Sequence, residues 1–213
     1  MEKELEGHVA RLTALGGGFG NSKKIYEDWA STYEENLQED YGYIAPRIAV
    51  DEFAANCSNQ DLRILDLGCG TGLVGKELIA RGFHVIDGLD YSPRMLAEAE
   101  KKGIYRNLLV GDMTQPLNLN GPCYDAAIAV GCFGGGHLGP QHLEGIIQSV
   151  KTDGLLVFYI NGIPYNQDDY PAHFQALEAA GVWQVNMTKE SNYMQALERP
   201  GWVVVANRGQ MKC

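Results

Sequence analysis

Short apolar runs alternate with amphipathic stretches along the chain from residue 62 onward. The apolar runs are expected to be strands, and they cover 63–68, 84–90, 107–112, 124–133, 154–161, 182–190 and 201–209. The stretches expected to be helices cover 71–82, 92–103, 140–151 and 173–181. Strands that are continuously apolar are buried on both faces, which is typical of a parallel sheet covered by helices. The pattern therefore predicts an α/β fold with a doubly wound, mostly parallel seven-stranded sheet.

The first part of the chain follows a helical period. Between residues 24 and 40 large apolar side chains recur every four positions, namely Ile25, Trp29, Tyr33 and Leu37. This spacing predicts one helix with acidic residues on its opposite face. Pro46 then favours the start of a second helix. We divide the chain into a mobile N-terminal arm (1–22), a helical segment (23–60) and a core (61–213).

Composition and charge narrow the class of protein. The 213 residues, 45% hydrophobic and 21% charged, fit one globular domain. A formal net charge of −10 repels phosphate backbones, so we expect no nucleic-acid partner. No apolar stretch reaches the roughly 18 residues of a membrane span, and the N-terminus is too charged for a secretory signal. We therefore expect a cytoplasmic monomer or homodimer with no membrane partner.

The cysteines form neither a metal-binding nor a disulfide pattern. There are five of them, at Cys57, Cys69, Cys123, Cys132 and Cys213. An odd number without C-x-x-C spacing is typical of free thiols in a reducing compartment. We therefore expect no bound metal.

Three glycines, Gly68, Gly70 and Gly72, directly follow the first predicted strand. Glycine lets the backbone turn tightly and lets a ligand lie against the main chain. In a doubly wound sheet, ligands bind at the carboxyl ends of the strands, and free N–H groups there favour an anionic or polar group. The glycines therefore predict a ligand site at this turn.

Acidic residues mark the ends of three neighbouring predicted strands: Asp66, Asp90 and Asp112. Asp90 lies about 20 residues beyond the glycines, the distance at which an acid reaches ribose hydroxyls. The third glycine comes one residue too early for the G-x-G-x-x-G dinucleotide spacing. Three acids would also repel pyrophosphate, but they suit a ligand with an amine, a ribose diol and an adenine amino group.

The segments ILDLGCGTGL, IDGLDYSPRML, VGDM and YDAAIAVGCF together resemble the class I S-adenosylmethionine-dependent methyltransferases over about residues 60 to 160. The whole chain is also similar to the methyltransferase-like family from the Williams-Beuren chromosomal region. The resemblance implies a Rossmann-like methyltransferase fold with an N-terminal helical lid, here 23–60. It also implies the cofactor S-adenosyl-L-methionine and transfer of its methyl group by in-line displacement.

The resemblance further implies roles for individual residues toward the cofactor. The three glycines would wrap the methionine part, Asp66 would lie near its ammonium through a water, and Asp90 would take the ribose hydroxyls. The remaining cofactor contacts would be Tyr91, Met95, Asp112, Met113 and Val130, with Tyr26 and Tyr33 from the lid. Alternatives stay open, because Asp66 and Asp90 could simply cap helices and Met95 could be a core residue.

Candidates for the acceptor side follow the later strands. His137 lies in a glycine-rich loop after the fourth strand, where it could accept a proton or only bond the backbone. Asn161, Tyr165 and Tyr193 are expected to contact the substrate. The acceptor atom could be nitrogen, oxygen or sulfur. The residues GCFG stand where enzymes that methylate base amino groups carry N/D-P-P-Y/F/W, which favours a small-molecule acceptor.

Two other classes of function compete with this hypothesis. A nucleotide-dependent oxidoreductase could use a related sheet, although the early third glycine disfavours it. A protein that binds the cofactor without transferring a methyl group would keep the same site residues. A protein acceptor also remains open.

Overall fold

Seven strands form one central sheet in the computed structural model, which describes residues 22–37, 41–117, 119, 123–134, 138–196 and 199–210. The strands are β1 (Ile64–Leu67), β2 (Ile86–Asp90), β3 (Asn107–Val110), β4 (Tyr124–Phe133), β5 (Val150–Asn161), β6 (Trp183–Met194) and β7 (Arg199–Arg208). Their order is β3-β2-β1-β4-β5-β7-β6. β7 is antiparallel to both neighbours, and the other pairs are parallel. The predicted doubly wound, mostly parallel sheet is confirmed.

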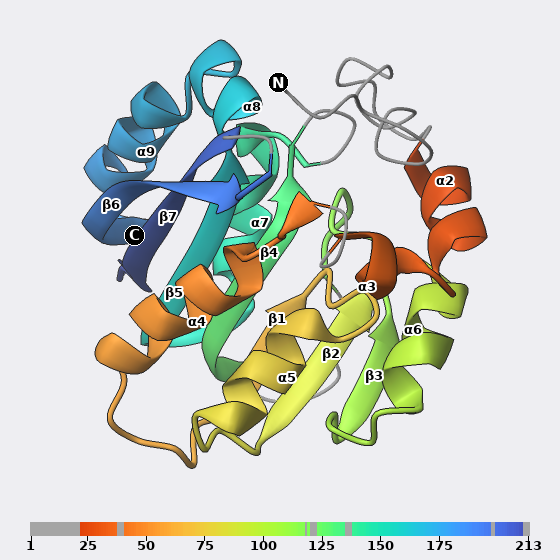
Figure 1. Cartoon of the computed structure of the whole chain (residues 1–213). Coiled ribbons are helices and arrows are strands. Elements are labelled where there is room, and N and C mark those ends of the chain that lie inside the picture. Colours follow the sequence, from red (N-terminus) through yellow and green to blue (C-terminus); the bar gives the residue numbers. More distant parts are fainter. Residues whose placement is uncertain are drawn as a thin grey trace.

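Helices cover both faces of the sheet (Figure 1). α4 (Ala45–Ala55) and α5 (Leu73–Ala80) share one apolar cluster with the sheet, and α7 (Leu143–Ile147) and α9 (Tyr170–Ala179) share the other. Successive residues of a strand enter opposite clusters, as Ile64 and Leu65 do in β1. Burial on both faces explains why the strands are apolar without alternation.

A crevice for ligands is expected where the strand order of the sheet reverses, between β1 and β4. β1 pairs with β2 on one side and with β4 on the other, so the chain leaves β1 and β4 in opposite directions. α6 (Pro93–Glu100) packs against β2 and β3, and Ser92 caps it by accepting from the Met95 N–H. The carboxyl ends of β1, β2 and β4 therefore meet at one edge, which we call the carboxyl edge.

The prediction of one continuous helix over 24–40 is wrong. α2 (Ser22–Trp29) ends in a turn, and α3 (Tyr33–Glu35) follows it. Residues 30–32 form a turn between the two helices, and the Trp29 indole N–H donates across it to Asn36 Oδ1 at 2.9 Å. The spacing still identifies buried positions, since Ile25, Trp29 and Leu37 are buried. Figure 1 places α2 and α3 beside α6.

Other boundaries also differ from the predicted ones. The helix expected over 140–151 is a 3₁₀ turn (Pro140–His142) followed by the short α7, because β5 begins at Val150. A helix that the sequence did not predict, α8 (Gly162–Gln167), follows β5. The predicted mobile arm, 1–22, lies outside the described residues except for Ser22.

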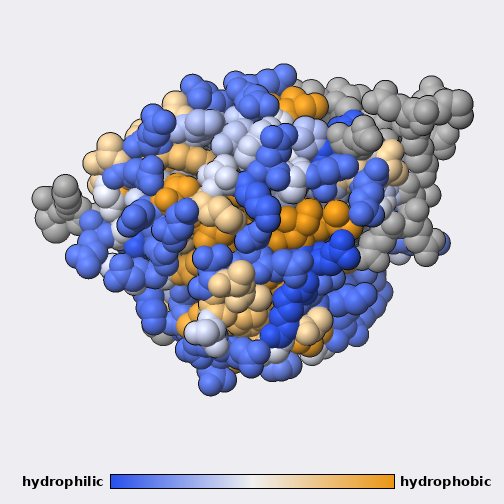
Figure 2. All heavy atoms as spheres, turned by 60° about the vertical axis from the view of Figure 1, so that its left-hand side comes forward, coloured by the Kyte–Doolittle hydropathy of each residue, from blue (hydrophilic) through white to orange (hydrophobic). Residues whose placement is uncertain are grey.

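The surface is mainly polar where it can be seen from the β6 side. Figure 2 shows hydrophilic residues over most of this face, with apolar residues in patches between them. Within the described ranges, no helix combines the length and the apolar character needed to cross a membrane.

Candidate functional site

The turn after β1 is built on glycines with left-handed backbone angles. Gly68, Gly70 and Gly72 have φ values of 67°, 53° and 97°. The N–H groups of Gly68 and Cys69 donate to the Leu89 carbonyl at 2.7 and 3.0 Å, which ties the turn to β2. A side chain at Gly68 would overlap the Cys132 Sγ. The turn, which we call the glycine turn (68–72), therefore brings bare main chain to the carboxyl edge.

Asp90, the last residue of β2, joins the glycine turn to the start of α6. Its Oδ2 accepts from the Gly70 N–H at 2.9 Å and its Oδ1 from the Ser92 N–H at 2.8 Å. The residue is 5% exposed, and burial raises the pKa of its carboxyl although these N–H groups lower it. An ionised carboxylate can accept about four hydrogen bonds, so both oxygens keep capacity for a ligand.

Asp66 lies below the glycine turn, inside β1. Its Oδ2 accepts from the Tyr105 hydroxyl at 2.6 Å. Oδ1 is buried and has no hydrogen-bond partner within the described part of the chain. Burial raises the pKa of Asp66 to about 7, the Tyr105 hydroxyl and the Gly75 N–H oppose that shift, and the Asp90 charge adds to it. A buried acceptor without a partner is unusual and points to a missing donor.

The α2–α3 segment carries a cluster of aromatic rings, of which Tyr33 lies near Asp90. The ring centroids of Trp29 and Tyr33 lie 4.8 Å apart, and those of Tyr26 and Tyr33 lie 6.0 Å apart. Burial raises the pKa of Tyr33, and the nearby Asp90 charge raises it further. Tyr33 therefore lies close enough to Asp90 for the two groups to interact electrostatically.

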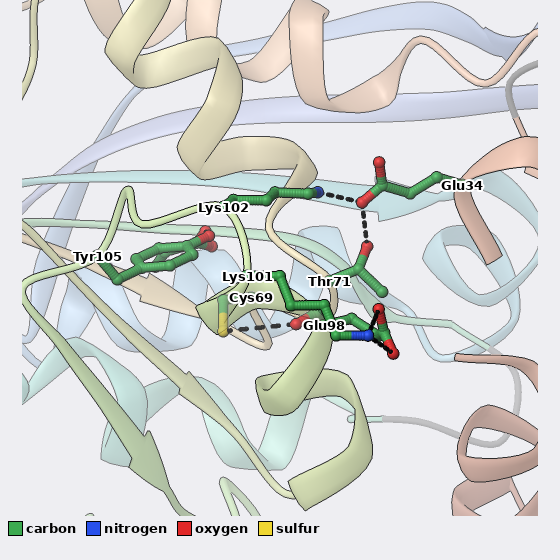
Figure 3. A network of polar contacts seen from close by, with 9 residues as sticks. Glu34, Cys69, Thr71, Glu98, Lys101, Lys102 and Tyr105 are labelled. Atoms are coloured by element: carbon green, nitrogen blue, oxygen red, sulfur yellow. Dashed lines mark hydrogen bonds and ion pairs between the residues drawn. The ribbon is translucent and has the colours of Figure 1, made fainter. Parts of the chain in front are cut away.

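A polar network fastens the α2–α3 segment to the glycine turn (Figure 3). Glu34 Oε1 accepts from the Thr71 hydroxyl at 2.6 Å and pairs with the Lys102 ammonium. Arg94 of α6 also donates to the Glu27 carbonyl at 3.2 Å. The segment is therefore held from both the glycine turn and α6.

At the end of β4 the main chain is closely approached by another part of the fold, as it is at the glycine turn. Val130 is buried, and Gly131 has a φ of 76°. A Cβ at Gly131 would lie 3.1 Å from the Tyr43 hydroxyl, and the Cys132 thiol donates to the Leu67 carbonyl at 3.0 Å. The ends of β1 and β4 are thus in contact, with a phenol directly beside them.

The cofactor contacts predicted at Tyr91, Met95, Asp112 and Met113 lie around β2, β3 and α6. Asp112 is exposed, and its Oδ1 accepts from the Thr114 N–H at 2.9 Å. The Met113 Cε would be 3.3 Å from a Cβ at Gly68, so this side chain reaches the glycine turn. Met95 is buried, and Tyr91 is half-buried.

The residues predicted on the acceptor side come from β5, α8 and β6. Asn161 precedes α8 as its N-cap residue. Tyr165 stacks on Trp202 at 4.2 Å and on Tyr170 at 5.9 Å, so both faces of its ring are occupied. Tyr193 lies within β6 and not in a connecting loop as the sequence suggested. His137 lies outside the described residues.

The sequence did not single out Tyr43, Tyr105 or Glu34. Tyr43 packs edge to face on Tyr193 at 6.1 Å and forms a bridge with Met194. Tyr105 sits in the loop between α6 and β3, where no periodicity marks it. Tyr43 and Tyr105 have one indirect sequence signal, because glycines at 72, 75 and 131 leave space for these two phenols.

Comparisons with known proteins agree with this geometry. A family model described as a methyltransferase domain matches residues 64–154. Methyltransferase-like protein 27 of Homo sapiens is 34% identical over 188 residues, which cover 82% of this chain and 74% of the human protein. The matched domain contains the glycine turn and both buried carboxylates.

Two further comparisons bear on the fold and on a shorter segment. An 18S rRNA (guanine(1575)-N(7))-methyltransferase of Saccharomyces cerevisiae is 42% identical over 67 residues, 32% of this chain and 24% of the yeast protein. The structure of magnesium protoporphyrin IX methyltransferase (ChlM) from Synechocystis PCC 6803 with bound SAM has a TM-score of 0.64 at 18% identity, covering 89% of this chain and 98% of that chain. The sheet and its helices are therefore shared with that structure.

Proposed function

Because this chain belongs to the methyltransferase-like family of class I S-adenosylmethionine-dependent methyltransferases, we propose that it transfers a methyl group from this cofactor to a small-molecule acceptor. Family membership disfavours the alternative of a nucleotide-dependent oxidoreductase. The observation that carries the proposal is the pair of buried carboxylates, Asp66 and Asp90, on either side of the glycine turn.

The residues present fit the cofactor. The unpartnered Asp66 Oδ1 suits an ammonium group, directly or through a water. Asp90 keeps acceptor capacity for two ribose hydroxyls after binding two N–H groups. We propose that the other contacts predicted from the family resemblance complete the site, namely Gly68, Gly70, Gly72, Tyr91, Met95, Asp112, Met113, Val130, Tyr26 and Tyr33.

The chain's own part in the reaction is to hold the reactants and exclude water. When bound, the cofactor supplies a methyl group on a positively charged sulfur, which is a good leaving group. Aromatic faces of Tyr26 and Tyr33 favour a nearby cation. The α2–α3 segment, fastened through Glu34, shields the carboxyl edge from solvent. His137 remains a proposal for a general base, needed for a hydroxyl or protonated amine and not for a thiolate.

A small acceptor fits the enclosed edge and the net charge of −10. Phenols line the approach beside β4, where Tyr43 lies against Gly131. RNA is the second candidate, because the similarity to an rRNA methyltransferase extends over 67 residues. Asn161, Tyr165 and Tyr193 remain proposed substrate contacts, of which Tyr193 packs directly on Tyr43.

Cofactor binding is tested by calorimetry with S-adenosylhomocysteine. We expect Asp90→Asn to weaken binding by about 10-fold or more, because hydrogen bonds to a charged group are worth roughly 1.5–3 kcal/mol. Asp61→Asn is the matched control, since this exposed acid precedes β1 and lies away from the carboxyl edge. Equal affinities for the parent and Asp90→Asn would show that the ribose contact is misplaced.

The acceptor class is tested with S-adenosylmethionine carrying a labelled methyl group. The full chain is incubated separately with a small-metabolite extract and with purified small ribosomal subunits. Label in the metabolite fraction supports the proposal. Label in rRNA alone overturns the small-molecule assignment, and tight cofactor binding without any transfer favours a non-catalytic binder.

A further inference from the structure

The ring of Tyr105 fills a space that glycines leave open. A Cβ at Gly75 would be 2.5 Å from the Tyr105 hydroxyl, one at Gly72 would be 3.2 Å from Cε2, and one at Gly88 would be 3.1 Å from Cδ1. Gly72 and Gly75 lie at the start of α5, and Gly88 lies in β2. The ring is therefore held between a helix and a strand, directly under the glycine turn.

The Tyr105 hydroxyl lies against the carboxylate of Asp66. It donates to Oδ2 at 2.6 Å; Asp66 is fully buried and Tyr105 is partly buried. Tyr105 is the side-chain partner of Asp66 among the described residues, and Oδ1 has none. The hydrogen bond fixes the rotation of the carboxylate, because one oxygen is held and the other is left for a different donor.

We propose that Tyr105 is a positioning residue for the cofactor: its hydroxyl holds Oδ2 of Asp66 in place and leaves Oδ1 to receive the ammonium of the methionine moiety. This inference rests on the proposed function, since it assumes S-adenosylmethionine at the carboxyl edge. Tyr105 acts through Asp66 and needs no contact with the cofactor itself.

The charges around Asp66 make this arrangement sensitive to pH. The titratable groups that face it are Tyr105, Asp90, Cys69 and Cys132. Burial raises the pKa of Asp66 to about 7, and the Tyr105 hydroxyl lowers it by stabilising the ionised form. An ammonium binds the ionised form, so affinity should rise with pH up to about 7 and then level off. Without the hydroxyl, the rise should move to higher pH.

The test is calorimetry of S-adenosylhomocysteine binding to the full chain between about pH 6 and about pH 9. Tyr105→Phe keeps the ring between the glycines and removes only the donor. Relative to the parent, we expect its affinity to be about 10-fold lower at about pH 6 and less than about 2-fold lower at about pH 9. The ratio to the parent cancels titration of the ligand's own amino group.

Tyr124→Phe is the matched control. The Tyr124 hydroxyl donates to buried Asp87 at 2.9 Å, and this pair lies at the opposite end of the strands from the glycine turn. We expect it to leave the pH profile of binding unchanged. Asp66→Asn should remove the part of the pH dependence that Tyr105→Phe shifts.

Distinct results overturn the positioning role and the proposed function. A parent that binds, with a Tyr105→Phe ratio independent of pH, overturns the positioning role alone. A profile of Asp66→Asn that matches the parent does the same, because another group would then set it. A folded parent that takes up no S-adenosylhomocysteine overturns the proposed function together with this inference.

Discussion

The carboxyl edge continues from β4 to the ends of β5 and β6, and its two halves are built in different ways. At β1 and β2 the polar groups are carboxylates held by main-chain N–H groups, as Asp90 is held by Gly70 and Ser92. At β4, β5 and β6 they are phenols packed on one another, as Tyr193 packs on Tyr43 at 6.1 Å and on Tyr159 at 5.8 Å. The first half depends on backbone geometry and the second on side-chain identity.

This difference suits the first half to binding an invariant cofactor and the second half to binding an acceptor that can vary. Main-chain N–H groups and glycine angles can change only if the turn itself changes, which suits recognition of one invariant cofactor. Ring-on-ring packing can be altered one side chain at a time without moving the sheet. Burial raises the pKa of Tyr159 to about 12 and also raises that of Tyr43, so these phenols are neutral donors near neutral pH. The second half can therefore be adapted to an acceptor independently of the first.

Gly68→Ala should give the largest effect and test the backbone half. The left-handed φ of 67° costs a residue with a side chain about 1–2 kcal/mol, and the added Cβ meets Cys132 as well. We expect a lower free energy of unfolding by denaturant and a loss of cofactor affinity of about 100-fold. Gly70→Ala, with a φ of 53° and no atom within 4 Å of the added Cβ, isolates the backbone cost.

The double variant Gly68→Ala with Cys132→Ala sharpens that result. It removes the overlapping sulfur and should recover part of the lost stability. If Gly68→Ala and Gly70→Ala behave alike, close packing under the turn has no role and the backbone half is less constrained than described.

Glu34→Gln should have an intermediate effect, because Glu34 fastens the cover rather than the turn itself. The contacts with Thr71 and Lys102 are partly exposed, so each is worth about 1 kcal/mol or less. We expect cofactor affinity to fall about 3- to 10-fold, with a smaller difference at high salt, where the ion pair is screened. Calorimetry at low and high salt measures both.

Glu35→Gln is the control for Glu34→Gln. Glu35 lies on the same short helix and is exposed. A loss of affinity equal to that of Glu34→Gln would mean that net charge, and not the network in Figure 3, produces the effect.

Tyr43→Phe should have the smallest effect on cofactor affinity and tests whether the halves are separate. The hydroxyl lies beside Gly131, on the acceptor half, and the ring stays in place in the variant. We expect cofactor affinity within about 2-fold of the parent and a slower labelled-methyl transfer, since one hydrogen-bonding group is lost. A loss of cofactor affinity as large as that of Glu34→Gln would break the comparison.

The sequence predicted the first half far better than the second. Continuous apolar runs identified the strands, and glycines after β1 identified the turn, because both follow from local backbone requirements. Asp90 could be predicted since it ends a strand at a fixed distance from the turn. These are short-range signals, and they survive in a single sequence.

The remaining contacts join residues far apart in the chain. Glu34 meets Thr71 and Lys102, and Tyr105 meets Asp66, 39 positions away. Periodicity shows that Trp29 is buried but not that its indole binds Asn36 or that α2 ends at Trp29. Which partner a buried face meets is decided by tertiary packing, so Glu34 had no readable signal and Tyr105 had only the indirect one of the glycines that leave space for it.

The carboxylate of Asp90 spans two loops at once, with one oxygen on Gly70 and the other on Ser92. One side chain therefore links the glycine turn and the start of α6, the two places where the ends of an elongated ligand would bind. Displacing either loop pulls on the other, so a fragment that occupies one seat should stiffen the second before anything has entered it.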